Sequence, residues 1–589
     1  MKYNLIILIL VVLLGAGGCT KFGNDFLEKP PSVDVTKDTI FSSLKYAERF
    51  LWGAYKTLPY GMPTNWAEGL TMNGDILESL TDLNQSDLTW AAGRTTYYPG
   101  AYNAGFEDNI TWGQGTKYNY SQRGINWKGI RASYIFIENI GTVPDADANR
   151  KRQLTAEARM IIAIHYTDMF RHLGGVPWVT HAYTVNENTN LSRLTSHATM
   201  DSIVGIIDKA IPDLPWIGQD ASNWDGRFTK AAAMGLKARV LLFGASPLYN
   251  SSTLFLAGES SDAKITWHGA YDPTLWVKAA DAAHELIVQV ETQGGYGLVK
   301  SGNPRKDFQD AYYKRGNGEL LITSRIMYKP NGFFDPNYLA YQIIAYYGIG
   351  GPTYNYVEMF PMANGKPITD PTSGYNSNNP LVNRDPRMYE TILVDDDYFM
   401  GRKAQMWIGG IDRPTADATN AATGFGWRKF GLERTNETSG GAVTEWPYLR
   451  LPEIYLAYAE AANEVNNGPT TEAYRCVNIV RNRVGLGDLP SGLTKEKFRE
   501  AVLTERACEF GYEDVRWFDL IRWKREADFQ KAITGLNIFR NPSTGVKTYV
   551  KFDMPARYWK TNFSPKWYLS AFPPSEIDKG YGLIQNPGW

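Results

Sequence analysis

The sequence predicts a mainly α-helical protein in which paired helices are joined by long, aromatic-rich loops. Apolar residues recur every three or four positions in ten segments, at 38–58, 127–140, 153–173, 199–214, 229–245, 274–290, 447–466, 471–485, 494–511 and 513–527. Clear stops such as Ser246-Pro247 separate these segments. Convincing strand patterns are few, and the best is at residues 319–326. The paired spacing fits a tetratricopeptide-like solenoid, although the chain lacks the 34-residue consensus of such repeats.

The composition is that of a large globular protein with many aromatic rings. The 589 residues carry 61 Lys and Arg against 62 Asp and Glu, so the net charge is −1. This balance gives no global field that would attract nucleic acid or an anionic membrane, and we expect no nucleic-acid partner. The six histidines include no pair at three- or four-residue spacing, and no CxxC is present. We therefore expect neither a metal site nor a cofactor.

The N-terminus has the pattern of an export signal. Lys2 precedes an unbroken apolar run from residue 5 to 14, and small residues then lead to Cys19. Ten apolar residues are too few to cross a bilayer core, which needs about twenty, so residues 1–18 are predicted to be a cleaved signal peptide. A cysteine directly after small residues resembles a bacterial lipobox, with Ala16 where leucine is usual. That resemblance implies lipidation of Cys19 and a membrane anchor. The alternative is ordinary signal cleavage with Cys19 as a spectator.

Three loop-like stretches concentrate the aromatic rings. Residues 89–120 hold eight aromatics in 32 positions, residues 327–360 hold ten in 34, and residues 395–446 include three tryptophans. Loops of this length are usually functional or disordered, and such ring density argues against disorder. A pyranose packs its C–H face on Trp or Tyr, and its hydroxyls bind amides, carboxylates and guanidinium groups. The pattern favours a carbohydrate ligand. Alternatively, the rings form small satellite cores that hold the loops to the scaffold. For any single ring this role is the more frequent one.

The candidate ligand-binding residues are rings flanked by polar loop residues, with polar side chains nearby as hydroxyl partners. The rings are Trp66, Trp90, Tyr97, Tyr98, Trp112, Tyr346, Tyr347 and Trp407, and the polar partners are Asn65, Asp75 and Arg94.

Charged residues near the C-terminus suggest structure rather than catalysis. Glu505 and Glu509 are spaced like a pair of glycosidase carboxylates. Arginines crowd the same segment, however, and would lower both pKa values instead of raising one for a general acid. We expect buried ion pairs here, and likewise around Asp385 and Arg387. The acidic run 395–397 could bind calcium, but such a run is more often a solvated turn.

Two further cysteines, Cys476 and Cys508, lie in helical segments, and the sequence leaves open whether they pair.

Several segments in order resemble the SusD/RagB family of Bacteroidota outer-membrane lipoproteins, over essentially the whole chain. They are DFLEKPP (25–31), YAERFLWGAYKTLPYG (46–61), WKGIRASYIFIENI (127–140), AEARMIIAIHYTDMFRHLGGVPW (156–178), GRFTKAAAMGLKARVLLF (226–243), NRDPRMYETIL (383–393), LRLPEIYLAYAEAANE (449–464), IVRNRVGLGDLP (479–490), LTERACEFGYEDVRWFDLIRWK (503–524), FPPSEI (572–577) and QNPGW (585–589). The chain departs from the family pattern at Asp514, where glycine is usual.

The resemblance implies a SusD-like helical fold built on four tetratricopeptide-like helix pairs, with ligand loops on that scaffold. It divides the chain into the signal peptide and one domain, 19–589, with family segments at about 19–245 and 270–589. Family members are non-enzymatic lipoproteins of the outer membrane that face the cell exterior. They capture an oligosaccharide or polysaccharide and pass it to a SusC-like TonB-dependent transporter. Two alternatives remain open, namely a RagB-type protein that captures peptides and a secreted glycoside hydrolase.

Overall fold

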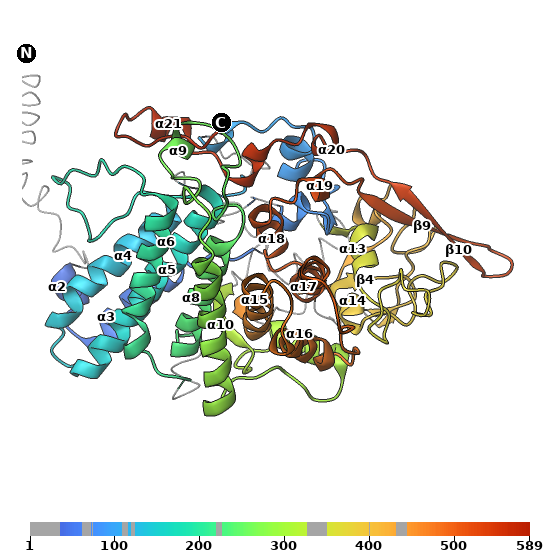
Figure 1. The fold of residues 1–589 in the computed structure, drawn as a ribbon, viewed down its shortest axis with the longest axis horizontal. Coiled ribbons are helices and arrows are strands. Elements are labelled where there is room, and N and C mark those ends of the chain that lie inside the picture. The colour runs from blue at the N-terminus through green and yellow to red at the C-terminus, as the bar shows by residue number, and fades with distance from the viewer. Residues whose placement is uncertain are drawn as a thin grey trace, which may run out of the picture.

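Helices pack side by side through most of the computed structural model (Figure 1). The structure describes residues 36–61, 72, 75–108, 116–118, 120, 124–218, 226–326, 350–399, 401–431 and 444–589. The longer helices are α3 (Leu44–Tyr55), α4 (Ile125–Asn139), α5 (Ala148–Leu173), α6 (Ser196–Asp208), α8 (Lys230–Ala245), α10 (Thr274–Gln293), α11 (Pro304–Tyr313), α15 (Leu451–Val465), α16 (Thr471–Arg483), α17 (Lys495–Phe510) and α18 (Arg516–Arg522). The prediction of a mainly helical fold is confirmed.

Successive helices contact one another in a continuous row. Helix α4 packs against α3 and α5, α5 against α6, and α6 against α8. Helix α10 then joins α8 to α15, which in turn packs on α16 and α17. The shorter helices are α2 (Lys37–Ile40), α9 (Glu259–Asp262), α13 (Tyr354–Met359), α14 (Pro386–Thr391), α19 (Glu526–Phe529), α20 (Trp559–Asn562) and α21 (Pro574–Ile577).

The helix starts follow local capping chemistry. Asp147 accepts a hydrogen bond from the Arg150 amide (2.8 Å) at the start of α5. Threonine side chains cap α6, α8, α16 and α17 in the same way. Each cap satisfies one of the backbone N–H groups that a helix leaves free at its first turn. Helix α5 ends at Gly174, whose φ of 85° suits glycine.

Strands are short and pair only in twos. The pairs are β1 (Asn84–Gln85) with β3 (Gly351–Pro352), β2 (Leu320–Ile326) with β8 (Thr444–Arg450), β4 (Ile392–Leu393) with β7 (Gly426–Trp427), β5 (Tyr398–Phe399) with β6 (Arg402–Lys403), and β9 (Thr534–Arg540) with β10 (Lys547–Asp553), all antiparallel. The predicted strand at 319–326 is confirmed as β2.

Three predicted helices differ in their bounds. The segment 38–58 is two helices, α2 and α3. Residues 447–450 belong to β8 rather than to a helix, because they pair with β2, and α15 starts only at Leu451. The segment 513–527 contains a seven-residue helix, α18, because left-handed residues flank it, Asp514 at φ 56° and Lys524 at φ 51°. Helix α11 was not predicted, although Asn303 and Pro304 form a standard start signal.

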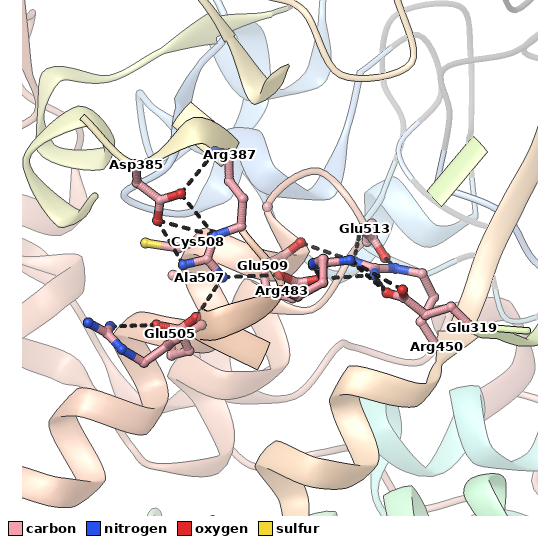
Figure 2. Close-up of polar contacts among 12 residues, drawn as sticks. Glu319, Asp385, Arg387, Arg450, Arg483, Glu505, Ala507, Cys508, Glu509 and Glu513 are labelled. Atoms are coloured by element: carbon pink, nitrogen blue, oxygen red, sulfur yellow. Dashed lines mark hydrogen bonds and ion pairs between the residues drawn. The ribbon is translucent and has the colours of Figure 1, made fainter. Parts of the chain in front are cut away.

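A buried network of arginines and carboxylates joins the C-terminal helices to the strands (Figure 2). Arg450 is fully buried, and its guanidinium contacts Glu319 (2.6 Å), Glu509 (3.0 Å) and Glu513 (2.8 Å). Arg483 bonds Glu319 and Glu509 as well. The network therefore links the residue before β2, the end of β8, α16 and α17.

A second arginine extends the network to α14. The Arg387 guanidinium contacts Asp385 (2.7 Å), Glu505 (2.6 Å) and Glu509 (3.1 Å) (Figure 2). Burial by itself would raise the pKa of Glu509, but Arg483, Arg450 and Arg387 hold that pKa well below its usual value. The predicted buried ion pairs are confirmed, both at Glu505 and Glu509 and around Asp385 and Arg387.

Replacing Arg450 by methionine should lower the free energy of unfolding by about 3–5 kcal/mol, because three buried carboxylates lose a shared cation. Denaturant unfolding of both proteins measures the change. The control is Lys551→Met, which breaks an exposed pair with Glu358 and should cost less than about 1 kcal/mol. Equal effects of the two substitutions would contradict a structural role for the network.

Candidate ligand-binding site

Two of the aromatic-rich stretches, 327–360 and 395–446, meet beside β1, which lies just before the third stretch, 89–120. Strand β1 pairs with β3, which places Gln85 opposite Gly351, and the Thr353 amide donates to the Leu83 carbonyl (3.0 Å). Strand β3 in turn contacts β7. Gly351 is required at this junction, because a Cβ there would lie 2.5 Å from the Gln85 carbonyl oxygen and 3.3 Å from Thr423. We call residues 84–98, 350–353 and 415–427 the loop platform.

Residues at other loop ends lie beside one another in the same way. Ser324 donates to the Pro59 carbonyl (2.7 Å), and the rings of Phe430 and Trp446 stack with centroids 5.5 Å apart. A Cβ on Gly61 would lie 2.6 Å from the Trp446 ring. Segments far apart in the sequence therefore begin and end at neighbouring points.

Three predicted site residues lie inside the fold. Tyr97 and Tyr98 are 1% and 9% exposed, and Asp75 is 2% exposed. The Tyr98 hydroxyl donates to the Ser79 carbonyl (2.7 Å) and accepts from the Ser86 amide (2.9 Å). The prediction that these three side chains face a ligand is wrong in this structure, because buried polar atoms take partners from their own loop.

Asp75 and Tyr97 organise the loop from within. The Asp75 carboxylate accepts hydrogen bonds from the amides of Ile76 (2.8 Å) and Gly93 (2.8 Å) and from the Ser79 hydroxyl (2.6 Å). Tyr97 stacks on Tyr102 with ring centroids 5.0 Å apart. These contacts are the satellite core that sequence reasoning kept as the alternative role.

Arg557 completes this core and was not predicted. Its guanidinium donates to the carbonyls of Thr81 (2.7 Å) and Asn84 (2.6 Å) and to the Gln85 side chain (3.0 Å). The same group lies 4.5 Å from the centroid of the Tyr98 ring. No sequence signal could have found it, because it lies more than 450 positions away from its partners.

Arg94, Trp90 and Trp407 keep part of their surface accessible. The Arg94 guanidinium bonds Asp87 at 2.6 Å, and the Arg94 side chain is 40% exposed. Burial and the nearby Asp417 raise the pKa of Asp87, and Arg94 opposes them. Trp90 is half-buried against the core, and Trp407 lies under the Arg540 guanidinium at 5.4 Å. A ring, a carboxylate and a guanidinium, those of Trp90, Asp87 and Arg94, therefore occur together in the 84–98 segment of the loop platform.

The other predicted site residues, Asn65, Trp66, Trp112, Tyr346 and Tyr347, lie outside the described residues, as does Cys19.

The acidic run and the cysteines have plain structural roles. Lys547 contacts Asp395 and Asp396, and Arg305 and Arg428 contact Asp397. Within the described ranges, no group of three or more His, Cys, Asp or Glu side chains could hold a metal ion. Cys476 and Cys508 are both buried and unpaired.

A buried carboxyl pair lies under the loop ends. The Asp514 amide donates to Glu78 at 2.7 Å, and a Cβ on Gly61 would lie 2.0 Å from an Asp514 carboxyl oxygen. Burial raises the pKa of Glu78, and burial together with Glu78 raises the pKa of Asp514 well above its usual value. Asp514 is the residue that stands where glycine is usual, at a φ of 56°.

Comparisons with known proteins agree with the fold. A sequence model described as "SusD family" matches residues 328–589, and one described as "Starch-binding associating with outer membrane" matches residues 25–242. The chain belongs to the SusD/RagB family.

The relatives include SusD-like proteins of Formosa agariphila. The SusD-like protein P38 of Formosa agariphila is 22% identical over 68% of this chain and 72% of its own length. The SusD-like protein P25 of the same species is 35% identical, but the match spans only 19% of this chain and 22% of P25.

Solved SusD-like structures share the fold along nearly the whole chain. A SusD-like protein from Bacteroides fragilis superposes with a TM-score of 0.72 at 22% identity, over 94% of this chain and 99% of its own. A second protein from that species, described as a SusD-like carbohydrate binding protein, has a TM-score of 0.68 at 20% identity, over 93% and 100% of the two chains. Among the described residues of this SusD/RagB protein, no helix is both long enough and apolar enough to span a membrane.

Replacing Asp514 by glycine should raise the free energy of unfolding by about 1 kcal/mol or more at pH 7, because it removes left-handed strain and a buried carboxyl. A carboxyl whose pKa is raised on folding contributes its full stabilisation below pH ~4. This stabilisation is lost as the pH rises through the raised pKa. The gain from Asp514→Gly should therefore be largest at neutral pH and shrink towards pH 4.

Thermal unfolding between pH 4 and pH 8 measures this dependence. Asp396→Gly is the matched control, because Asp396 also has a left-handed φ of 64° but its side chain is 60% exposed. Its stability difference should not grow with pH. A gain from Asp514→Gly that is equal at pH 4 and pH 7 would contradict the buried carboxyl pair.

Proposed function

We propose that this SusD/RagB protein is an outer-membrane lipoprotein that captures an oligosaccharide or polysaccharide and passes it to a SusC-like TonB-dependent transporter. The observation that carries the proposal is the meeting of two aromatic-rich stretches, 327–360 and 395–446, beside β1 at the loop platform. The family description "Starch-binding associating with outer membrane" supports both the ligand class and the location. So does the Bacteroides fragilis relative described as carbohydrate binding.

The chemistry of the loop platform suits a sugar. A half-buried ring such as Trp90 can pack on the C–H face of a pyranose without losing much conformational entropy. The Arg94–Asp87 pair offers donors and acceptors to the hydroxyls at the edge of the sugar. Asn65, Trp66, Trp112, Tyr346, Tyr347 and Trp407 remain proposed members of this site.

Binding without hydrolysis is the activity that we propose. A glycosidase needs one carboxylic acid with a raised pKa and one ionised carboxylate beside the scissile bond. Glu505 and Glu509, which have the spacing of such a pair, are both bonded to Arg387 inside the fold. Since three arginines outweigh the effect of burial and leave Glu509 with a lowered pKa, this pair is unsuited to general-acid chemistry.

Replacing Trp90 by alanine should weaken glycan binding by about 10- to 100-fold, near 2 kcal/mol, if its ring is a central platform for the sugar. Affinity electrophoresis against a panel of polysaccharides, starch first, followed by calorimetry with the retained glycan, measures the loss. The matched control is Trp52→Ala, since Trp52 is 48% exposed on α3. A hydrolysis assay on the same panel should release no sugar.

Two outcomes would overturn the proposal. Heat from peptides and none from glycans would move the protein to peptide capture, and reducing sugar released by the purified protein would make it a hydrolase. Equal binding by the Trp90 and Trp52 variants would remove Trp90 from the site.

Replacing Cys19 by alanine should shift the protein from the membrane fraction to the soluble fraction of the cell, because the lipid-bearing thiol is lost. Fractionation of cells that express each form, followed by immunoblotting, measures the distribution. The control Thr20→Ser should leave the protein in the membrane fraction, because it retains the cysteine. Membrane retention of the Cys19 variant would contradict lipid anchoring at this residue.

A further inference from the structure

An aromatic cleft lies between the 177–191 loop and the region of α21. The cleft has a volume of about 490 Å³, within the ~300–1,000 Å³ typical of small-molecule sites. Four rings line it, those of Tyr120, Trp127, Tyr183 and Tyr581. Helix α21 lies at the upper left of Figure 1, whereas β4, which pairs with β7 of the loop platform, lies on the right. None of the described residues that line the cleft belongs to the loop platform.

The rings are fixed by their neighbours. Tyr120 meets Trp127 edge to face, with centroids 5.6 Å apart and planes at 87°. Its other edge contact is with Phe572 at 4.8 Å. Tyr183 stacks on His181 at 4.1 Å. Rings held in this way lose little further entropy when a ligand packs against them.

Polar groups converge on the same space. The Tyr581 hydroxyl donates to Glu576 (3.1 Å) and the Lys579 ammonium contacts the same carboxylate oxygen, Oε2 (2.7 Å). Tyr120 is 4% exposed, and its hydroxyl makes no hydrogen bond within the part of the chain that the structure describes. Burial raises the pKa of Tyr120, so this hydroxyl stays protonated and can donate to a ligand.

The charge balance selects a neutral ligand. Glu576 and Lys579 are the charged groups among the described lining residues, and they neutralise each other. An anionic or cationic ligand would gain no unpaired partner there. Asn190 and Thr189 at the rim add uncharged donors and acceptors.

Both walls are held before any ligand arrives. Tyr134 donates to the Val179 carbonyl (2.9 Å), and Arg131 donates to the Tyr183 carbonyl (2.5 Å). Arg193 ties this loop to the C-terminal segment through the Ile584 carbonyl (2.7 Å) and the Asn586 side chain (2.8 Å). The cleft is thus a built feature of the fold rather than a gap between free loops.

We propose that this cleft is a second binding site for a neutral oligosaccharide, distinct from the loop platform. Aromatic faces at an angle to one another, with hydroxyl, amide and carboxylate groups at their edges, match the two kinds of surface that a pyranose presents. The inference rests on the proposed function in that it requires a glycan ligand. Two sites on one long glycan would bind it more tightly than either site does alone.

The test is calorimetry of the protein and its variants with malto-, cello-, xylo- and manno-hexaose. The variant Tyr183→Ala/Tyr581→Ala removes two rings of the cleft, and Tyr581→Phe removes only the hydroxyl that bonds Glu576. Tyr271→Ala is the matched control, because Tyr271 is 51% exposed and does not line the cleft. Thermal unfolding identifies any variant that fails to fold, and Tyr581→Phe then carries the test.

One hexasaccharide should bind the parent protein at two sites, and the double variant should lose one of them. Tyr581→Phe should weaken that site several-fold, Tyr271→Ala should change nothing, and Trp90→Ala should leave the cleft site intact. A single site that is lost in Trp90→Ala and unaffected by the double variant would overturn the second site and leave the proposed function standing. A single site lost only in the double variant would support the cleft and overturn the loop platform. No heat from any hexasaccharide, or heat from peptides at the cleft, would overturn the inference.

Discussion

The fold depends on charges that are buried together. Arg450 and Arg483 share Glu319 and Glu509, and Arg387 joins the same cluster from α14. Each charge is costly to remove from water, and its partners compensate that cost only when all are in place. The cluster therefore fixes how β2, α14, α16 and α17 meet.

The helices and the long loops have different roles in this protein. The helix row gives a scaffold whose core is continuous, and the loop strands β1, β3 and β7 contact one another. Loops of this length would lose much entropy on ordering. Interior side chains such as Asp75, Tyr98 and Arg557 limit that loss by bonding the loop backbone from below. The accessible rings can then vary without disturbing the scaffold.

Asp514, which stands where glycine is usual in the family, affects the protein through its tertiary contacts. A left-handed backbone position favours glycine, yet this chain has a carboxyl there, next to Glu78 and under the loop ends. The result is a pair of carboxyls with raised pKa values at the base of the loops. Stability of this region is thereby linked to pH, whereas the arginines of the nearby cluster lower the pKa of Glu509.

The sequence by itself determined the helical class, most helix bounds, the strand β2 and the buried ion pairs, because these follow from local periodicity and from charges that need partners. It also determined which stretches carry rings. Only the tertiary structure decided which rings are accessible. Tyr97 and Tyr98 are buried while Trp90 is not, although all three share one loop. Burial depends on distant residues such as Arg557 and Trp559, and the cleft at Tyr120 and Tyr581 joins residues more than 400 positions apart. No local pattern records such contacts, since they form only when the helices have packed.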